Sequence, residues 1–189
     1  MHRHDGSKRE GHCHRAKFTE GLLDNERILE TLNVKAGQTV LDAGCGNGYM
    51  SKLFSNQVAP SGKVYALDPD KHFINILEDE TRETPVSTIV GDITRPTPLD
   101  DASIDLLYIS TVIHAFSQQQ MQAFVREAKR LLKHGALLAI VEIEKKETPF
   151  GPPLELRYSP EELKAVVSMT PVKTVPVAEH FYMQVFKNQ

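Results

Sequence analysis

Several features are scarce in this chain of 189 residues, and each scarcity disfavours a class of protein. Only two cysteines occur, Cys13 and Cys45, so we do not expect a disulfide framework. No apolar run reaches the ~20 residues that a membrane-spanning helix needs. The formal net charge of -3 provides no general basic field for nucleic acid or for an anionic membrane. The N-terminal residues lack the apolar centre of a secretory signal, so we expect a cytoplasmic protein without a nucleic-acid or membrane partner.

The N-terminal segment has the most unusual composition. It contains His2, His4, His12, Cys13 and His14. We expect residues 1–20 to form a flexible His-rich arm and residues 21–189 to form a single domain. Imidazole and thiolate groups can hold a metal, but the adjacent side chains of HCH lack the spacing of a structural zinc site. A flexible tail without metal is the favoured interpretation, and metal capture is the alternative.

After the arm, apolar runs alternate with amphipathic segments. We expect strands at 39–42, 63–68, 86–91, 104–110, 136–143, 172–177 and 180–186, and helices at 22–32, 49–56, 70–81, 118–133 and 160–169. This alternation predicts an α/β fold with a doubly wound, Rossmann-like sheet of seven strands. The sheet should be mostly parallel, with an antiparallel strand from the C-terminal hairpin. Ligands of such sheets bind beyond the carboxyl ends of the strands.

The stretch VLDAGCGNGYM, residues 40–50, joins the first strand to a helix. Gly44, Gly46 and Gly48 allow unusual backbone dihedral angles and a close approach to a ligand. The pattern of a dinucleotide site, G-x-G-x-x-G, fails because Tyr49 stands at its last position. A phosphate-binding P-loop fails because no Gly-Lys-Ser/Thr follows. The negative charge of Asp42 is also badly placed beside a pyrophosphate.

A second carboxylate, Asp68, ends the next strand in VYALDPD. A carboxylate at a strand end can accept hydrogen bonds from both hydroxyl groups of a ribose. VLDAGCGNG, followed by ALDPD and GDIT, resembles the class I S-adenosylmethionine-dependent methyltransferases over about residues 40–143. The segment from Leu131 to Leu163 resembles their small, capless branch related to the ubiquinone and menaquinone methyltransferases.

The resemblance implies S-adenosylmethionine as the cofactor and a role for nine residues in binding it. Asp42, Gly44, Gly46 and Asn47 would contact the methionine end of the cofactor. Asp68 would bind the ribose, and Pro69 would lie along the adenosine. Asp92 and Ile93 would contact the adenine, and Ser110 would lie near the sulfonium. This cofactor carries no phosphate, which explains the negative charge beside the glycine loop. Asp92 has a competing interpretation as a turn residue that caps the backbone at Thr94. Cys45 is interpreted as a small packing residue.

Three side chains are candidates on the substrate side. His114 in ISTVIHAFS could deprotonate or orient a nucleophile, or it could be structural. Glu142 ends the fifth strand and could face the same cavity or solvent. Arg157 could bind an anionic substrate, or it could pair with Glu155 or Glu161. No metal is expected in the catalytic site.

The favoured function is methyl transfer to a small-molecule nucleophile by in-line displacement, catalysed by a monomer or homodimer. The sequence ISTV at 109–112 stands where enzymes that methylate amides or exocyclic amines carry Asn-Pro-Pro-aromatic, which disfavours protein and nucleic-acid acceptors. A non-catalytic cofactor-binding scaffold of the same fold is the first alternative. An NAD-dependent oxidoreductase is the second.

Overall fold

The computed structural model of the protein describes residues 21–189. The predicted arm, residues 1–20, lies outside this part of the chain. The strands are β1 (Thr39–Ala43), β2 (Lys63–Asp68), β3 (Val86–Val90), β4 (Ile104–Ser110), β5 (Leu132–Ile143), β6 (Thr170–Ala178) and β7 (Phe181–Lys187). The α-helices are α1 (Asn25–Leu32), α2 (Tyr49–Val58), α3 (Lys71–Glu80), α4 (Gln118–Leu131) and α5 (Pro160–Val166). Within residues 21–189, no helix combines the length and the apolar character needed to cross a membrane.

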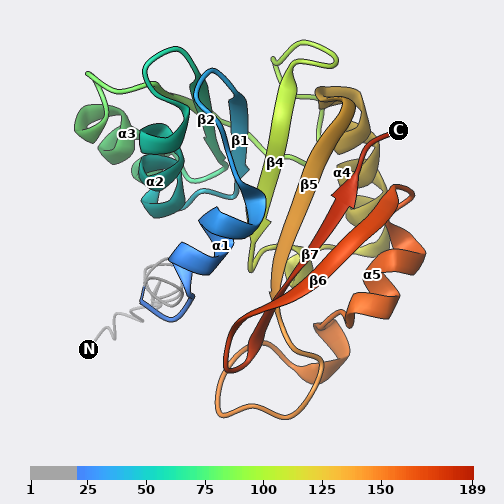
Figure 1. The fold of residues 1–189 in the computed structure, drawn as a ribbon. Coiled ribbons are helices and arrows are strands. Elements are labelled where there is room, and N and C mark those ends of the chain that lie inside the picture. The colour runs from blue at the N-terminus through green and yellow to red at the C-terminus, as the bar shows by residue number, and fades with distance from the viewer. Residues whose placement is uncertain (1–20) are drawn as a thin grey trace, which may run out of the picture.

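The seven strands form one sheet in the order β3-β2-β1-β4-β5-β7-β6 (Figure 1). Strands β1 to β5 pair in parallel, and β7 pairs antiparallel with both β5 and β6. The predicted fold is therefore confirmed, including its C-terminal hairpin. Helices α1 and α2 cover one face of the sheet through Ile28 and Phe54, whereas α4 and α5 cover the other face through Phe124 and Leu163.

Local signals explain most helix boundaries. Asp24 accepts a hydrogen bond from the Arg27 backbone N–H and caps α1. Ser159 and Glu162 form a reciprocal capping box at the start of α5, where Pro160 takes the first helical position. Three boundaries were predicted wrongly: α1 begins at Asn25 and not at 22, α5 ends at Val166 and not at 169, and β5 begins at Leu132 and leaves no loop after α4. Leu132 pairs with Ile104 at the start of β4, ahead of a register shift, so tertiary pairing extends the strand back to the end of α4.

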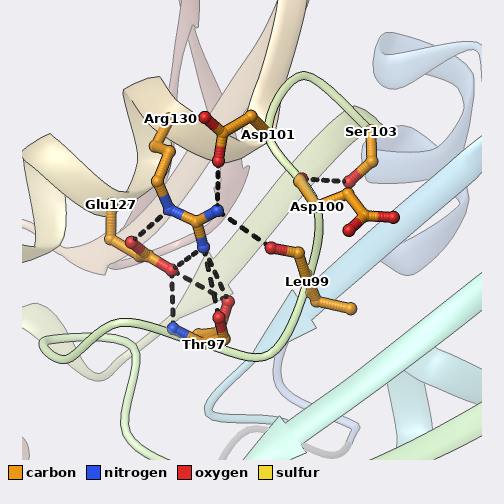
Figure 2. Close-up of polar contacts among 7 residues, drawn as sticks. All are labelled: Thr97, Leu99, Asp100, Asp101, Ser103, Glu127 and Arg130. Atoms are coloured by element: carbon orange, nitrogen blue, oxygen red, sulfur yellow. Dashed lines mark hydrogen bonds and ion pairs between the residues drawn. The ribbon is translucent and has the colours of Figure 1, made fainter.

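A polar network fixes the loop that leads into β4, at the amino end of that strand (Figure 2). Glu127 of α4 is buried and accepts hydrogen bonds from the backbone N–H and the hydroxyl of Thr97, each at 2.8 Å. Arg130 donates to Glu127 and Asp101, and to the Leu99 carbonyl oxygen. This network lies away from the carboxyl ends of the parallel strands, where α1 and the 144–158 loop lie (Figure 1).

Candidate functional site

The glycine loop is held against the ends of β2 and β4. Gly44 and Cys45 donate backbone hydrogen bonds to the Leu67 carbonyl oxygen, at 2.7 and 3.1 Å. Gly44 has a φ of +72°, and a Cβ atom there would lie 2.6 Å from Val112 Cγ2. A side chain at this position would therefore strain the backbone and displace Val112. The glycine keeps the loop close to the residues that follow β4.

Asp68 joins the glycine loop to the start of α3. Its carboxylate accepts from the backbone N–H groups of Gly46 at 2.9 Å and Asp70 at 2.8 Å. The residue is 9% exposed, and burial raises the pKa of its carboxyl group above the ordinary value although both N–H groups oppose this change. Each carboxylate oxygen keeps a lone pair for a further donor.

Asp42 is more deeply buried, at 3% exposure, and lies at the end of β1. Its Oδ2 atom accepts a hydrogen bond of 2.6 Å from the Ser51 hydroxyl of α2. Burial raises the pKa of Asp42 to about 7, and the nearby charge of Asp68 acts in the same direction, while Ser51 lowers it. The two carboxylates favour a cationic ligand at this edge and disfavour a pyrophosphate.

A first cavity of about 320 Å³ opens beside these residues. It is lined by Leu23, Asn25, Asp42, Gly44, Cys45, Gly46, Asn47, Tyr49, Met50, Asp68, Pro69, Phe73, Tyr108, Ser110, Thr111, Val112, His114 and Ala115. The neighbouring Tyr108 and Ser110 hydroxyl groups are buried there without a well-formed hydrogen bond to the residues that the structure describes. A polar ligand in this cavity would satisfy them. The structure thus brings together seven of the nine predicted cofactor residues.

The other two predicted cofactor residues, Asp92 and Ile93, are not among the residues within 21–189 that line this first cavity. Asp92 accepts hydrogen bonds from the backbone N–H and the hydroxyl of Thr94, each at 2.8 Å. This is the turn geometry that the alternative interpretation gave. Ile93 is buried in the core on the α4 side of the sheet. The role of both residues at the adenine remains a prediction.

A second cavity of about 430 Å³ adjoins the first and lies under the 144–158 loop. It is lined by Thr111, His114, Ala115, Ile143, Phe150, Gly151, Pro152, Pro153, Leu156 and Phe181. The two cavities share Thr111, His114 and Ala115. Thr111 has a φ of +54°, a left-handed conformation that is strained for a β-branched residue.

The partly buried His114 and the buried Glu142 form a pair at this junction. The His114 Nδ1 atom lies 2.9 Å from Glu142 Oε2, and Glu142 Oε1 accepts from the backbone N–H of Ile113 at 3.0 Å. Glu142 is 1% exposed, so it is not the surface charge that one interpretation allowed. The Glu142 carboxylate orients the imidazole ring through Nδ1. His114 itself lines both the first and the second cavity.

Neither Glu142 nor Arg157 is among the residues within 21–189 that line the first or the second cavity, although Arg157 lies directly behind the wall of the second. Its guanidinium donates to oxygen atoms of the 144–152 segment at 2.7–3.2 Å, namely the carbonyl oxygens of Glu144, Lys146, Phe150 and Pro152 and the hydroxyl of Thr148. These acceptors differ from the predicted partners Glu155 and Glu161. Arg157 therefore shapes the loop that walls the second cavity.

Several lining residues were not predicted as part of the site. Tyr108 and Phe73 line the first cavity, and Phe150, Leu156 and Phe181 line the second. Their sequence signal, an apolar or aromatic side chain in or beside a regular element, is the same as that of core residues. Cys45 also lines the first cavity, and burial raises the pKa of its thiol, which supports its interpretation as a neutral packing residue.

Comparisons with known proteins agree with this site. Residues 41–140, more than half of the chain, match the family described as "Methyltransferase domain", so the chain belongs to this methyltransferase family. A demethylmenaquinone methyltransferase of Staphylococcus carnosus is 26% identical over 135 residues, which cover 70% of this chain and 54% of that protein. An uncharacterized methyltransferase of Synechocystis is 29% identical over 133 residues, covering 68% of this chain and 58% of that protein. The chain spans about half the length of these curated relatives.

A solved structure gives a fuller match. The crystal structure of a SAM-dependent methyltransferase from Aquifex aeolicus superposes with a TM-score of 0.81, at 27% identity, over 92% of this chain and 94% of that one. These findings confirm the recognised class and its cofactor, S-adenosylmethionine. The residues of the first cavity fit this group, because two carboxylates would face a cationic nucleoside and the buried hydroxyl groups of Tyr108 and Ser110 could bind a polar ligand.

Proposed function

We propose that this protein transfers the methyl group of S-adenosylmethionine to a small-molecule nucleophile bound in the second cavity. One observation carries the proposal: the cavity beside Asp68 and the glycine loop meets a second cavity at Thr111, His114 and Ala115. When bound, the cofactor supplies an electrophilic methyl group on a sulfonium. The protein needs to place an acceptor in line with that group, and such positioning accounts for much of the catalysis of bimolecular transfers.

The residues of the first cavity divide the binding task by their chemistry. Asp68 would accept from the ribose hydroxyl groups, and Asp42 and the glycine loop would hold the methionine end. Ser110 would lie near the sulfonium at the end of β4. Asn47 and Pro69 line the same cavity and would complete the contacts to the cofactor.

The size of the second cavity and the net charge of the chain support a small acceptor. At about 430 Å³ the cavity has the size of a typical small-molecule site, and the 144–158 loop walls it. The relatives include enzymes named for demethylmenaquinone, a small molecule. The net charge of -3 supports an acceptor other than nucleic acid. We retain a cytoplasmic location and a monomer or homodimer as proposals that rest on the sequence.

Titration calorimetry with S-adenosylmethionine tests the proposed binding site. Asp68→Ala should weaken binding at least about 30-fold, because each hydrogen bond to a charged group contributes about 1.5–3 kcal/mol. Asp68→Asn keeps an oxygen for the Gly46 N–H, so its affinity for S-adenosylmethionine should lie between those of the wild type and Asp68→Ala. Asp79→Ala, an exposed change on α3, is the matched control and should bind normally. Wild-type affinity in Asp68→Ala would refute the assignment of the site.

Transfer itself is tested with radiolabelled cofactor and a broad panel of small nucleophiles. Methylated product should form with at least one of them. Saturable cofactor binding without any product would support the non-catalytic scaffold instead. Binding of NAD in place of S-adenosylmethionine would support the oxidoreductase.

A further inference from the structure

The second cavity is apolar almost throughout. Its walls come from Ile143, Phe150, Leu156 and Phe181, with two prolines, and the rings of Phe150 and Phe181 stack at 6.1 Å with an interplanar angle of 28°. Among its lining residues within 21–189, His114 is the one ionisable side chain. The guanidinium of Arg157, which could have attracted an anion, is engaged by oxygens of the loop. Such walls favour an uncharged ligand with flat apolar surface.

The contact between His114 and Glu142 favours one tautomer of the imidazole ring. Glu142 is buried, and its two oxygen atoms already face the Ile113 N–H and His114 Nδ1. A carboxylate accepts and does not donate, so the imidazole hydrogen lies on Nδ1. The Nε2 atom of the neutral ring then carries the lone pair. A ring held in this way can accept a proton from a group in the cavity that it lines.

We propose that the second cavity takes a flat, uncharged, largely apolar ring compound with an acidic hydroxyl group, such as a phenol, and that His114 accepts the proton of that hydroxyl. This inference rests on the proposed function and names its acceptor class. The acceptor O–H bond breaks and its proton moves to His114 Nε2. The acceptor oxygen forms the new bond to the methyl carbon as the carbon–sulfur bond breaks with its electron pair left on sulfur. Glu142 is a positioning residue, and the proton leaves His114 for water after product release.

A phenol whose ionised form is coloured tests the proton transfer without requiring catalysis. p-Nitrophenol is titrated, below its own pKa, into wild-type protein saturated with S-adenosylhomocysteine. The bound probe should be ionised to a greater extent than the free probe in the same buffer. In His114→Ala the probe should bind and stay protonated. The exposed His134→Ala is the matched control and should give the wild-type spectrum.

Glu142→Gln separates positioning from packing. The Ile113 N–H requires the amide oxygen on its side, so the amide N–H would face His114 Nδ1 and place the imidazole hydrogen on Nε2. The fold should persist, as thermal melting would show, while the ionisation of bound p-nitrophenol is lost. Glu142→Asp would keep the carboxylate and restore part of the ionisation.

Activity gives a second readout that depends on the acidity of the acceptor. In His114→Ala the kcat for phenols should fall about 100-fold or more, the usual contribution of a general base, with less change in KM. An arylthiol is largely ionised near neutral pH and needs no base. The ratio of arylthiol to phenol rates should therefore rise about 100-fold in this variant.

The outcomes distinguish this inference from the proposed function. Equal p-nitrophenol spectra in wild type and His114→Ala would overturn the proton transfer, even if S-adenosylmethionine binds as expected. Failure of both p-nitrophenol and 2-naphthol to bind, with cofactor binding intact, would overturn the apolar hydroxyl acceptor. Loss of cofactor binding in the wild type would instead refute the proposed function.

Discussion

Asp42 should make the ligand-free protein less stable as pH rises. Its pKa is about 7 in the fold, whereas the ordinary value is 3.8. The folded protein therefore keeps a proton that the unfolded chain releases between these two values, so the free energy of unfolding falls across this window. The difference amounts to at most about 4 kcal/mol, reached above pH 7.

Asp42→Asn removes this titration while keeping an oxygen for the Ser51 hydroxyl. Chemical denaturation at several pH values between 4 and 8 measures the effect, without cofactor. The variant should match the wild type near pH 4 and exceed it by up to about 4 kcal/mol at pH 8. Asp79→Asn, an exposed carboxyl, is the control and should follow the wild-type profile.

The same variant should bind S-adenosylmethionine more weakly, since it lacks the charge that faces the cationic ligand. A gain in stability with a loss of affinity would show that the carboxylate serves the ligand at the expense of the fold. Parallel pH profiles for Asp42→Asn and wild type would refute the reasoning. A variant less stable than wild type at pH 8 would refute it as well.

Two further substitutions test the loop and the remote network. Arg157→Ala should free the loop oxygens that the guanidinium holds, speed proteolysis within residues 144–158 and weaken acceptor binding about tenfold, with unchanged cofactor affinity in calorimetry; a loop as resistant as the wild type would contradict this. Arg130→Ala should lower the free energy of unfolding by about 3 kcal/mol, because Glu127 stays buried without its ion pair, and should leave cofactor binding unaltered. Burial raises the pKa of Glu127, but hydrogen bonds from Arg130 and Thr97 lower it overall. The stability that the Arg130–Glu127 pair contributes should therefore be lost as pH falls. An equal difference in stability between variant and wild type at every pH would contradict this.

The sequence was most informative where local chemistry fixes position. Asp42 and Asp68 each end an apolar run, and parallel strands bring such ends to one edge of the sheet, so their meeting beside the glycine loop could be predicted. The alternation of strands and helices predicted the sheet for the same reason. The start of β5 could not be predicted, because its first residue, Leu132, pairs with Ile104 of β4 through a contact that has no local signal.

Contacts between residues that are distant in the sequence could not be predicted from the sequence. His114 and Glu142 were each proposed as site residues, but their contact spans 28 positions and depends on how the segment after β4 folds back over β5. Arg157 was proposed to bind an anionic substrate or to pair with Glu155 or Glu161, whereas it donates mainly to main-chain oxygens of the 144–152 segment. Every residue has a main-chain carbonyl group, so the residue type gives no signal that its carbonyl oxygen will accept a hydrogen bond from Arg157.

The attachment of the 144–158 loop has a consequence for how this enzyme could change over evolutionary time. Of the first and second cavities, the segment lines the second only. The guanidinium of Arg157 holds the segment by hydrogen bonds to its own oxygen atoms. The sequence of the segment could therefore diverge or lengthen without changing the strand ends where the nucleoside is proposed to bind. Changes in this loop would alter which acceptor binds, while the first cavity, proposed for the methyl donor, would stay the same.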